Sequence, residues 1–210
     1  MRELDQLRLG FLSSHGGSNM QAIFDARKAG RLDAAMCVVI SNNSRSAALR
    51  RAKREQVPFY HLSERTHPGP EKLDGAILQT FEKHDVNLVV LAGYMKLLGP
   101  KTLYRYRGRV LNVHPALLPK FGGKGFYGRA VHEAVLAAGE SVTGVTIHLV
   151  DQWFDHGPIV AQTEVSVLDR DTPDSLGERV LRREHQFYSE TLRRIQQGEI
   201  DLDRLSGGGG

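Results

Sequence analysis

Short apolar runs alternate with longer amphipathic segments along the chain, and this alternation constrains the fold more than any other feature. Apolar runs such as Asn87–Leu91, which is followed by Gly93, are typical of strands covered on both faces. Amphipathic segments such as Glu71–His84 predict helices between such strands. The sequence therefore predicts an α/β fold, a Rossmann-like and mostly parallel sheet flanked by helices.

The predicted elements follow one another without an internal repeat or a linker, so we expect a single domain over residues 1–205 and a disordered tail over 206–210. The predicted strands are Leu7–Ser13, Ala34–Ser41, Val57–Leu62, Asn87–Leu91, Val110–Val113, Val142–Val150 and Pro158–Val167. The predicted helices are Asn19–Ala29, a helix that follows Asn42–Ser46 and ends near Gln56, Glu71–His84, Arg129–Ala138, and Pro173–Gln197 with Asp171 or Thr172 as its N-cap.

Charge and composition limit the classes of function. The formal net charge of +4 is compatible with anionic ligands and does not require nucleic acid. The basic segment Arg45–Arg54 has no interleaved aromatic residues; we interpret it as a solvated helix face, with an anion-attracting patch as the alternative. No apolar run reaches the ~20 residues of a membrane helix, and Met1–Gly10 lacks a secretory signal. Cys37 is the only cysteine, which favours a reducing cytoplasm.

A glycine-rich turn, Ser14–Asn19, joins the first predicted strand to the first predicted helix. Glycines allow a backbone to approach an anion closely, and the free N–H groups of a helix N-terminus attract it. The turn matches neither the dinucleotide fingerprint nor the P-loop. It predicts a phosphate site for another kind of ligand, and a tight turn with a Ser or Asn cap is the alternative.

Asn112 and His114 stand at the end of the fifth predicted strand, which Pro115 terminates. Residues two apart on a strand point to the same face, and open α/β sheets place their sites at the carboxyl ends of strands. An amide can donate to an oxyanion, and a histidine transfers protons near neutral pH. Structural roles at a strand end are the alternative for both residues.

For two later residues, the local sequence allows both a structural role and a role in the site. His148 lies on the predicted strand Val142–Val150 and is either a core histidine or a site residue. Asp155 opens a turn before Gly157, so an ordinary turn aspartate is one interpretation and a site residue is the other.

In combination, these segments resemble one family. From about Leu7 to about Gly198 the sequence is similar to the glycinamide ribonucleotide formyltransferases of purine synthesis, which use 10-formyltetrahydrofolate as the formyl donor. The resemblance is carried by the order and spacing of five segments. These are Gly17-Ser18-Asn19, Leu91–Met95, Leu111–Pro119, Gly144–His148 and Asp155-His156-Gly157-Pro158.

The resemblance implies a set of site residues and no metal. The catalytic residues that it implies are Asn112, His114 and Asp155. The residues that it implies for the ribonucleotide are Gly17, Ser18 and Asn19 at the phosphate and Glu184 at the ribose. The residues that it implies for the folate are Met95, Lys96, Leu97, Leu98, Asn112, Val150, Asp151, Phe154 and Asp155. The implied partners are small molecules, with no nucleic acid or membrane, and the chain is expected to be a monomer or a homodimer.

The implied reaction is acyl transfer from the folate to an amine. Asn112 and a protonated His114 are expected to donate hydrogen bonds to the developing oxyanion, and His114 to pass a proton to the departing folate nitrogen. Asp155 is expected to orient the imidazole and to raise its pKa.

Three features depart from the bacterial pattern of the family. Pro70 stands where an arginine is expected on the folate side, and Leu181 where a glutamine is expected near the ribonucleotide. The loop Phe121–Gly128 is longer and richer in glycine than usual. These departures affect peripheral contacts and leave the three implied catalytic residues in place.

Three other functions stay open at this point. Relatives that formylate initiator methionyl-tRNA or sugar amines usually carry an additional C-terminal domain, and formyltetrahydrofolate hydrolases an N-terminal one; we expect neither here. A non-catalytic folate or nucleotide binding module is the third possibility, and the presence of all three implied catalytic residues argues against it.

Overall fold

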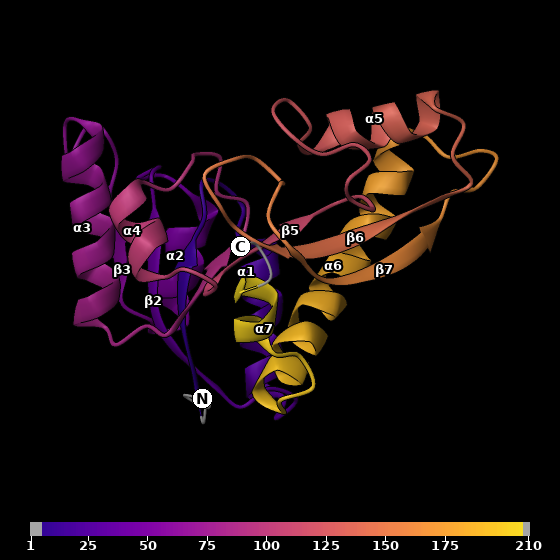
Figure 1. The fold of residues 1–210 in the computed structure, drawn as a ribbon. Helices are drawn as coiled ribbons and strands as arrows, with labels where there is room; N and C mark the ends of the chain where they lie inside the picture. Colours follow the sequence, from indigo (N-terminus) through magenta and orange to yellow (C-terminus); the bar gives the residue numbers. More distant parts are fainter. Residues whose placement is uncertain (1–5, 208–210) are drawn as a thin grey trace.

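The computed structural model describes residues 6–207, and seven strands form one sheet in the order β3-β2-β1-β4-β5-β6-β7 (Figure 1). The strands are β1 (Leu7–Leu12), β2 (Ala34–Ser41), β3 (Phe59–His61), β4 (Leu88–Leu91), β5 (Val110–His114), β6 (Val142–Leu149) and β7 (Ile159–Ser166). The helices are α1 (Ser18–Lys28), α2 (Ala47–Arg54), α3 (Pro70–Lys83), α4 (Pro100–Arg105), α5 (Arg129–Ala137), α6 (Pro173–Gln196) and α7 (Leu202–Gly207).

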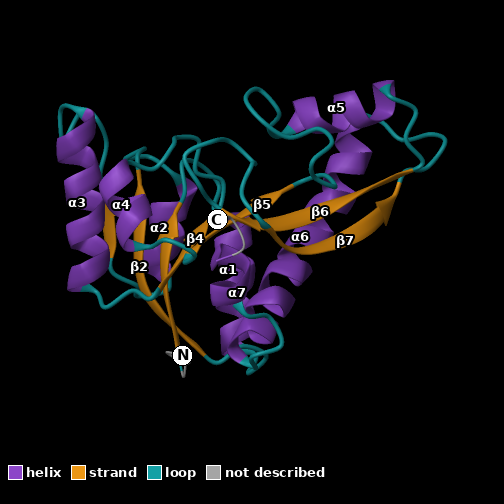
Figure 2. Cartoon of the chain, viewed as in Figure 1, coloured by secondary structure: helices purple, strands orange, loops and turns teal. Residues whose placement is uncertain are grey.

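Strands β1 to β5 pair in parallel, and β6 and β7 continue the sheet in antiparallel fashion. Figure 2 shows the strands crossing the middle of the molecule with helices around them. The predicted fold class is confirmed. Helices link the parallel strands because parallel neighbours need a long crossover, whereas the short loop after Leu149 suffices for the antiparallel pair β6–β7.

Two hydrophobic cores lie on opposite faces of the sheet. Side chains of α1, α2, α5, α6 and α7 contribute to the larger core, which includes Phe11, Leu111 and Tyr188. Side chains of α3 join the smaller core around Phe81 and Val110. The alternation of Val110 and Leu111 between the two cores follows from the two-residue period of a strand. It assigns Asn112 and His114 to the same side as Val110.

Several element boundaries differ from the predicted ones. Strand β3 is only three residues long, and the short helices α4 and α7 were not predicted. Helix α7 reaches Gly207, so the first two residues of the expected disordered tail are helical, and 208–210 lie outside the described residues. Thr172 is the N-cap of α6, and its side chain forms a capping box with Ser175.

The strand order creates a switch point between β1 and β4. The chain leaves β1 towards β2 on one side, and it leaves β4 towards β5 on the other. Loops that leave the carboxyl ends of such neighbours diverge, and open α/β sheets bind ligands in the crevice that results. The turn at 13–17 and the loop at 92–99 therefore flank the expected position of a ligand. Among residues 6–207, every helix is too short or too polar to cross a membrane.

Candidate active site

Asn112, His114 and Asp155 lie together, as the resemblance implied. Asn112 and His114 share one face of β5, and Asp155 approaches them from the loop between β6 and β7. Asp155 adopts a left-handed backbone conformation with φ of 53°, which is uncommon for a residue with a side chain. The two parts of the group thus come from segments about forty residues apart, and the antiparallel pairing of β5 with β6 joins them.

The His114 imidazole lies between two hydrogen-bond acceptors. Its Nδ1 is 3.3 Å from Asp155 Oδ2, and its Nε2 is 2.8 Å from the backbone oxygen of Phe121. A carbonyl oxygen only accepts, so Nε2 carries a proton and donates to Phe121. The side chain is only 3% exposed.

Burial sets the protonation of His114. Burial lowers its pKa, while the carboxylate of Asp155 and the carbonyl of Phe121 raise it part of the way back, and His148 lowers it further. The net pKa lies below the ordinary value of 6.5. Asp155 raises this pKa, as expected from the sequence, but burial outweighs it because the fold excludes water from the imidazole. The expectation that a protonated His114 takes part in the reaction stays a prediction.

The Asp155 carboxylate has several partners and a lowered pKa. Burial alone would raise this pKa, but contacts with His148 and His114 and the N–H of Gly123 outweigh burial. The Gly123 N–H donates to Oδ2 over 3.1 Å, and Asn112 Nδ2 lies 3.4 Å from Oδ1. The carboxylate is consequently held in its ionised form beside the imidazole.

The glycine-rich loop 121–128 contacts both residues of the His114–Asp155 pair through its backbone. The Phe121 carbonyl accepts from His114, and the Gly123 N–H donates to Asp155. Phe121 has a φ of 56°, so its carbonyl points inward from a left-handed residue. No side-chain pattern could have predicted these contacts, because they involve main-chain atoms only.

His148 also belongs to the group. It lies on β6 directly opposite Asn112, and its Nε2 is 3.1 Å from Asn112 Nδ2 and 3.4 Å from Asp155 Oδ1. The sequence left His148 open between core and site. Its alternation with Ile147 on β6 was the available signal, since a histidine facing away from the apolar side of its strand suggests a polar neighbour.

The glycine-rich turn lies at the N-terminus of the eleven-residue helix α1. Gly17 has a φ of 65°, and a Cβ at this position would lie 2.9 Å from the Cβ of Ala48 on α2. Both facts require glycine. Arg51 Nε donates to the carbonyl of Gly16 over 3.0 Å, so one residue of the basic segment braces the turn rather than only facing solvent. Ser18 begins the helix.

Glu184 of α6 contacts the turn from the other end of the sequence. Asn19 Nδ2 donates to Glu184 Oε2 over 2.6 Å. Glu184 is 7% exposed, and burial raises its pKa to about 7 even though the hydrogen bond from Asn19 lowers it. The structure therefore joins the predicted phosphate and ribose residues, Gly17, Asn19 and Glu184, in one place.

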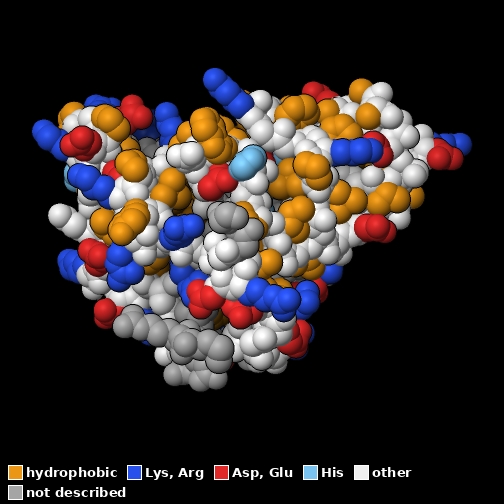
Figure 3. Space-filling model, viewed as in Figure 1, with side chains coloured by type: hydrophobic (Ala, Val, Ile, Leu, Met, Phe, Trp, Pro, Cys, Tyr) orange, Lys and Arg blue, Asp and Glu red, His pale blue; other side chains and the backbone are white. Residues whose placement is uncertain are grey.

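Apart from Asn112 on β5, the residues expected at the folate lie on two loops, after β4 and after β6. Met95, Leu97 and Phe154 are exposed there, whereas Leu98 is buried in the smaller core. Figure 3 shows hydrophobic side chains reaching the surface on the face that Figure 1 views. Exposed apolar side chains suit a flat aromatic ligand better than an ion.

Three further residues of this set are polar or only partly exposed. Lys96 Nζ lies 3.8 Å from Glu64 Oε1. Asp151 orders its own loop, because its Oδ1 accepts from the N–H of Trp153 over 2.8 Å. Val150 is half-buried against the smaller core.

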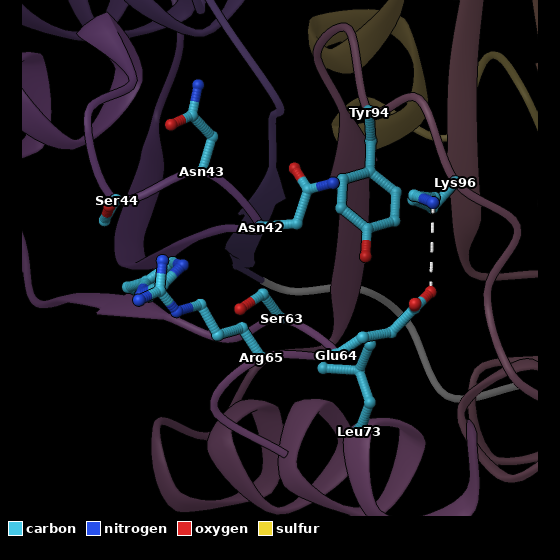
Figure 4. Close-up of a pocket in the computed structure, with 10 residues that line it drawn as sticks. Asn42, Asn43, Ser44, Ser63, Glu64, Arg65, Leu73, Tyr94 and Lys96 are labelled. Carbon is cyan, nitrogen blue, oxygen red and sulfur yellow. Dashed lines mark ion pairs between the residues drawn. The ribbon is translucent and has the colours of Figure 1, made fainter. Parts of the chain in front are cut away.

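A cavity of about 340 Å³ opens at the carboxyl ends of β2 and β3, and Tyr94 and Lys96 of the loop after β4 also line it (Figure 4). Figure 4 shows Lys96 and Glu64 paired among the residues that line it. The full lining is Asn42, Asn43, Ser44, His61, Ser63, Glu64, Arg65, Leu73, Tyr94 and Lys96. No residue of the group around His114 lines the cavity, and Lys96 alone of the lining residues was predicted as a site residue.

Buried polar atoms near these strand ends indicate where a polar ligand would be accommodated. Ser13 Oγ, Asn19 Oδ1 and Asn42 Oδ1 have no hydrogen-bond partner among residues 6–207. Buried polar groups are almost always paired, so three unpaired atoms at one edge of the sheet fit a site for a polar ligand. All three follow or lie close to the carboxyl ends of β1 and β2. Within the same residues, no group of three or more His, Cys, Asp or Glu could hold a metal ion.

Pro70 and Leu181, the two residues that depart from the bacterial pattern of the family, both lie on helices. Pro70 is the first residue of α3, where a proline has the right φ and needs no N–H partner. Leu181 lies on α6 and is partly exposed. Arg65, in the loop before Pro70, lines the cavity.

Comparisons with known proteins agree with this geometry. The model of the formyl transferase family matches residues 7–192. The phosphoribosylglycinamide formyltransferase of Haemophilus influenzae is 35% identical, over 93% of this chain and 90% of its own length. Glycinamide ribonucleotide transformylase 1 from Symbiobacterium toebii has a solved structure with a TM-score of 0.85 and 36% identity, over 92% of this chain and 89% of that one.

A chloroplastic phosphoribosylglycinamide formyltransferase of Vigna unguiculata is 38% identical over 92% of this chain. The present chain spans 62% of the length of that plant protein, less than two thirds. The family match covers most of the chain, including every residue of the group around His114. This protein therefore belongs to the formyl transferase family.

Proposed function

We propose that this protein transfers the formyl group of 10-formyltetrahydrofolate to the amine of glycinamide ribonucleotide, a step of purine synthesis, and does so in the cytoplasm. The observation that carries the proposal is the contact of His114 with Asp155 beside Asn112, in a site with an anion-binding turn on the same sheet edge. Similarity to proteins named for this reaction supports the choice of substrates.

Asn112 acts on the charge that develops at the formyl oxygen. One of its amide N–H groups is held by only a long contact of 3.4 Å with Asp155, so a better acceptor can take it over. A donor aimed at a developing oxyanion in a site without bulk water lowers the barrier substantially. Asn112 is thus the electrostatic stabiliser.

His114 moves the proton that the reaction releases. The attacking amine loses one proton, and the departing folate nitrogen gains one, so one shuttled proton balances the transfer. Because the pKa of His114 is lowered, its neutral ring can accept the amine proton and deliver it to the leaving nitrogen. For Nε2 to accept that proton, the ring proton must lie on Nδ1, where Asp155 accepts it, and Nε2 must leave the carbonyl of Phe121. The glycines of the loop 121–128 permit such a movement.

Asp155 stabilises the imidazolium that forms in passing. It faces Nδ1 over 3.3 Å, and its own lowered pKa keeps it ionised near neutral pH. A carboxylate in this position orients the ring and favours its charged form without itself taking the proton.

The ribonucleotide is assigned to the turn and the folate to the loops. Gly17, Ser18 and Asn19 would hold the phosphate at the N-terminus of α1, and Glu184 the ribose hydroxyls. Met95, Leu97 and Phe154 would contact the pteridine, and Lys96 and Arg65 supply positive charge for the carboxylates at the other end of the folate.

The decisive experiment measures tetrahydrofolate release with and without glycinamide ribonucleotide. Release only when the amine is present establishes the transferase. Release in both cases would identify a hydrolase, and release in neither would leave a binding module. The exposed variant Asp169→Asn serves as a control for handling, since this turn residue lies outside the site.

A further inference from the structure

His148 is the one residue of the group around His114 to which the proposed reaction assigns no role. It is a buried histidine, 2% exposed, on β6, and it pairs in register with Asn112 on β5. A buried imidazole requires partners for both of its nitrogens. The identity of those partners determines what the ring can do.

The first nitrogen fixes the tautomer. Nδ1 of His148 lies 2.8 Å from the backbone oxygen of Leu149. A carbonyl oxygen has no proton to give, so Nδ1 carries the proton and donates. The neutral ring then presents a lone pair at Nε2, because a neutral imidazole carries only one N–H.

The second nitrogen fixes the orientation of Asn112. In this neutral ring Nε2 accepts from Asn112 Nδ2 over 3.1 Å, and the same NH2 group lies 3.4 Å from Asp155 Oδ1. Nε2 is also 3.4 Å from Asp155 Oδ1, and only the charged ring, with a second proton on Nε2, could donate to that carboxylate and lower its pKa. The inference concerns the neutral ring. With the amide turned over, its oxygen would face that lone pair and be repelled. The ring therefore keeps the NH2 group, rather than the carbonyl, on the side of β6.

This anchoring leaves one amide proton for catalysis. His148 holds the first N–H of Asn112, and the second is 3.4 Å from Asp155 Oδ1, a weaker contact. The second N–H is consequently oriented in advance and easily exchanged to a stronger acceptor. A developing oxyanion is such an acceptor.

We propose that His148 is a positioning residue for formyl transfer: its Nδ1–H tautomer, fixed by the Leu149 carbonyl, sets the amide orientation of Asn112. The inference rests on the proposed function and adds to it a residue that contacts no substrate. His148 acts on the reaction only through Asn112.

The test compares two substitutions of similar size. His148→Leu removes the acceptor and should lower kcat on the order of 10²-fold, because a misplaced catalytic group costs that much. His148→Gln places an amide oxygen near the position of Nε2 and should retain most of the activity. KM for both substrates should change little in either variant. A His148→Leu enzyme with the wild-type kcat overturns the inference.

A double-mutant cycle separates positioning from general support of the fold. In an Asn112→Ala background, His148→Leu should lower kcat less than twofold further, because the residue through which it acts is already gone. An additive loss would show that His148 acts elsewhere. Thr143→Val is the matched control, a buried polar residue of the same strand whose hydroxyl has no partner among residues 6–207. It should keep the wild-type kcat.

Two results distinguish failure of the inference from other failures. If the wild type transfers no formyl group, the proposed function fails, whatever the variants do. If His148→Leu does not fold, nitrogen-15 NMR of the wild-type imidazole still decides the matter. The spectrum should show His148 protonated at Nδ1 and not at Nε2, and a ring protonated at Nε2, alone or together with Nδ1, overturns the inference.

Discussion

Asp155 and Glu184 are both largely buried carboxyl groups, and their pKa values shift in opposite directions. Asp155 lies beside His114, and Glu184 lies beside the glycine-rich turn. Asp155 is 11% exposed at its side chain and has a pKa below the ordinary value. Glu184 is 7% exposed, and its pKa is raised to about 7. Burial raises the pKa of both, so burial cannot explain the difference.

The partners explain it. Asp155 faces two imidazoles and the N–H of Gly123, which together outweigh the cost of burying a charge. Glu184 has one neutral donor, Asn19, and this single hydrogen bond does not outweigh the effect of burial on its pKa. Near neutral pH the protein thus maintains an ionised carboxylate beside His114 and a carboxyl group near its titration point beside the turn.

Asp155→Asn is expected to have the largest effect of these variants, because it removes the carboxylate beside His114. The substitution is nearly isosteric and removes the charge that favours the imidazolium of His114. We expect kcat to fall on the order of 10³-fold or more, as for other carboxylates that orient a catalytic histidine. KM for the ribonucleotide should change little, because its phosphate is assigned to the distant turn.

An NMR titration accompanies this measurement. The pKa of His114 should fall further below that of the wild type, because Asp155 raises it and the asparagine does not. The exposed variant Asp169→Asn should keep both the wild-type kcat and the wild-type His114 pKa. An Asp155→Asn enzyme with normal kcat would refute the role assigned to Asp155.

Glu184→Gln tests the raised pKa of Glu184 through the pH dependence of the free energy of unfolding. The folded pKa of Glu184, about 7, lies above the ordinary 4.5, so its stabilising contribution is complete below pH 4.5 and is lost as pH rises through about 7. The glutamine keeps an acceptor for Asn19 and has no such loss. Urea denaturation at pH 8 should therefore give the variant a free energy of unfolding on the order of 3 kcal/mol above that of the wild type. Near pH 4 the two free energies of unfolding should be equal.

The control for this stability measurement is Glu178→Gln, an exposed residue of the same helix. Its stability difference from the wild type should be small at every pH. A Glu184→Gln difference that is the same at pH 4 and pH 8 would contradict the buried, raised carboxyl group.

A folate analogue of the 5-deaza type should protect the protein against thermal unfolding. At a hundredfold excess over its dissociation constant, linkage predicts about 2.7 kcal/mol, or roughly 5–10 °C in Tm for a chain of this size. The shift should be equal in the wild type and in Glu184→Gln, because the proposal assigns the folate to the loops after β4 and β6 and the ribonucleotide to Glu184. Absence of any shift in the wild type would count against the folate assignment.

Gly17→Ala tests the turn itself and has the smallest expected effect. The positive φ and the close approach of Ala48 make a side chain costly, by about 2 kcal/mol, and affinity for the ribonucleotide should fall as the turn adjusts. Gly16→Ala is the matched control for stability, because a Cβ there meets no atom within 4 Å. Denaturant midpoints and calorimetry measure the two effects. Equal stability of the two variants would show that the turn tolerates a side chain.

The polarity pattern of the strands could be interpreted from the sequence because it is local. The apolar run at Leu88–Leu91 and the proline after His114 depend only on neighbouring residues, and both appear in the structure as predicted. Helices α4 and α7 were missed because each is six residues long, too short for a helical period to stand out.

In the candidate site, too, some features followed from the sequence and others only from the packing of distant segments. The resemblance identified Asn112, His114 and Asp155, and residue spacing placed the first two on one strand face. The approach of Asp155 and Glu184 to their partners depends on segments far apart in the chain, which only packing brings together. The positions assigned to ligands stay predictions until the variants above are measured.

By itself the sequence determined the α/β class, the strand ends at which polar side chains gather, and the kind of chemistry that those side chains permit. The tertiary structure decided their protonation and orientation. The lowered pKa of His114 and the raised pKa of Glu184 both arise from burial by distant segments. The amide of Asn112 is oriented by a histidine on the neighbouring strand. The physical reason is that side-chain type is a local property, whereas desolvation and hydrogen-bond partners depend on which parts of the chain pack together.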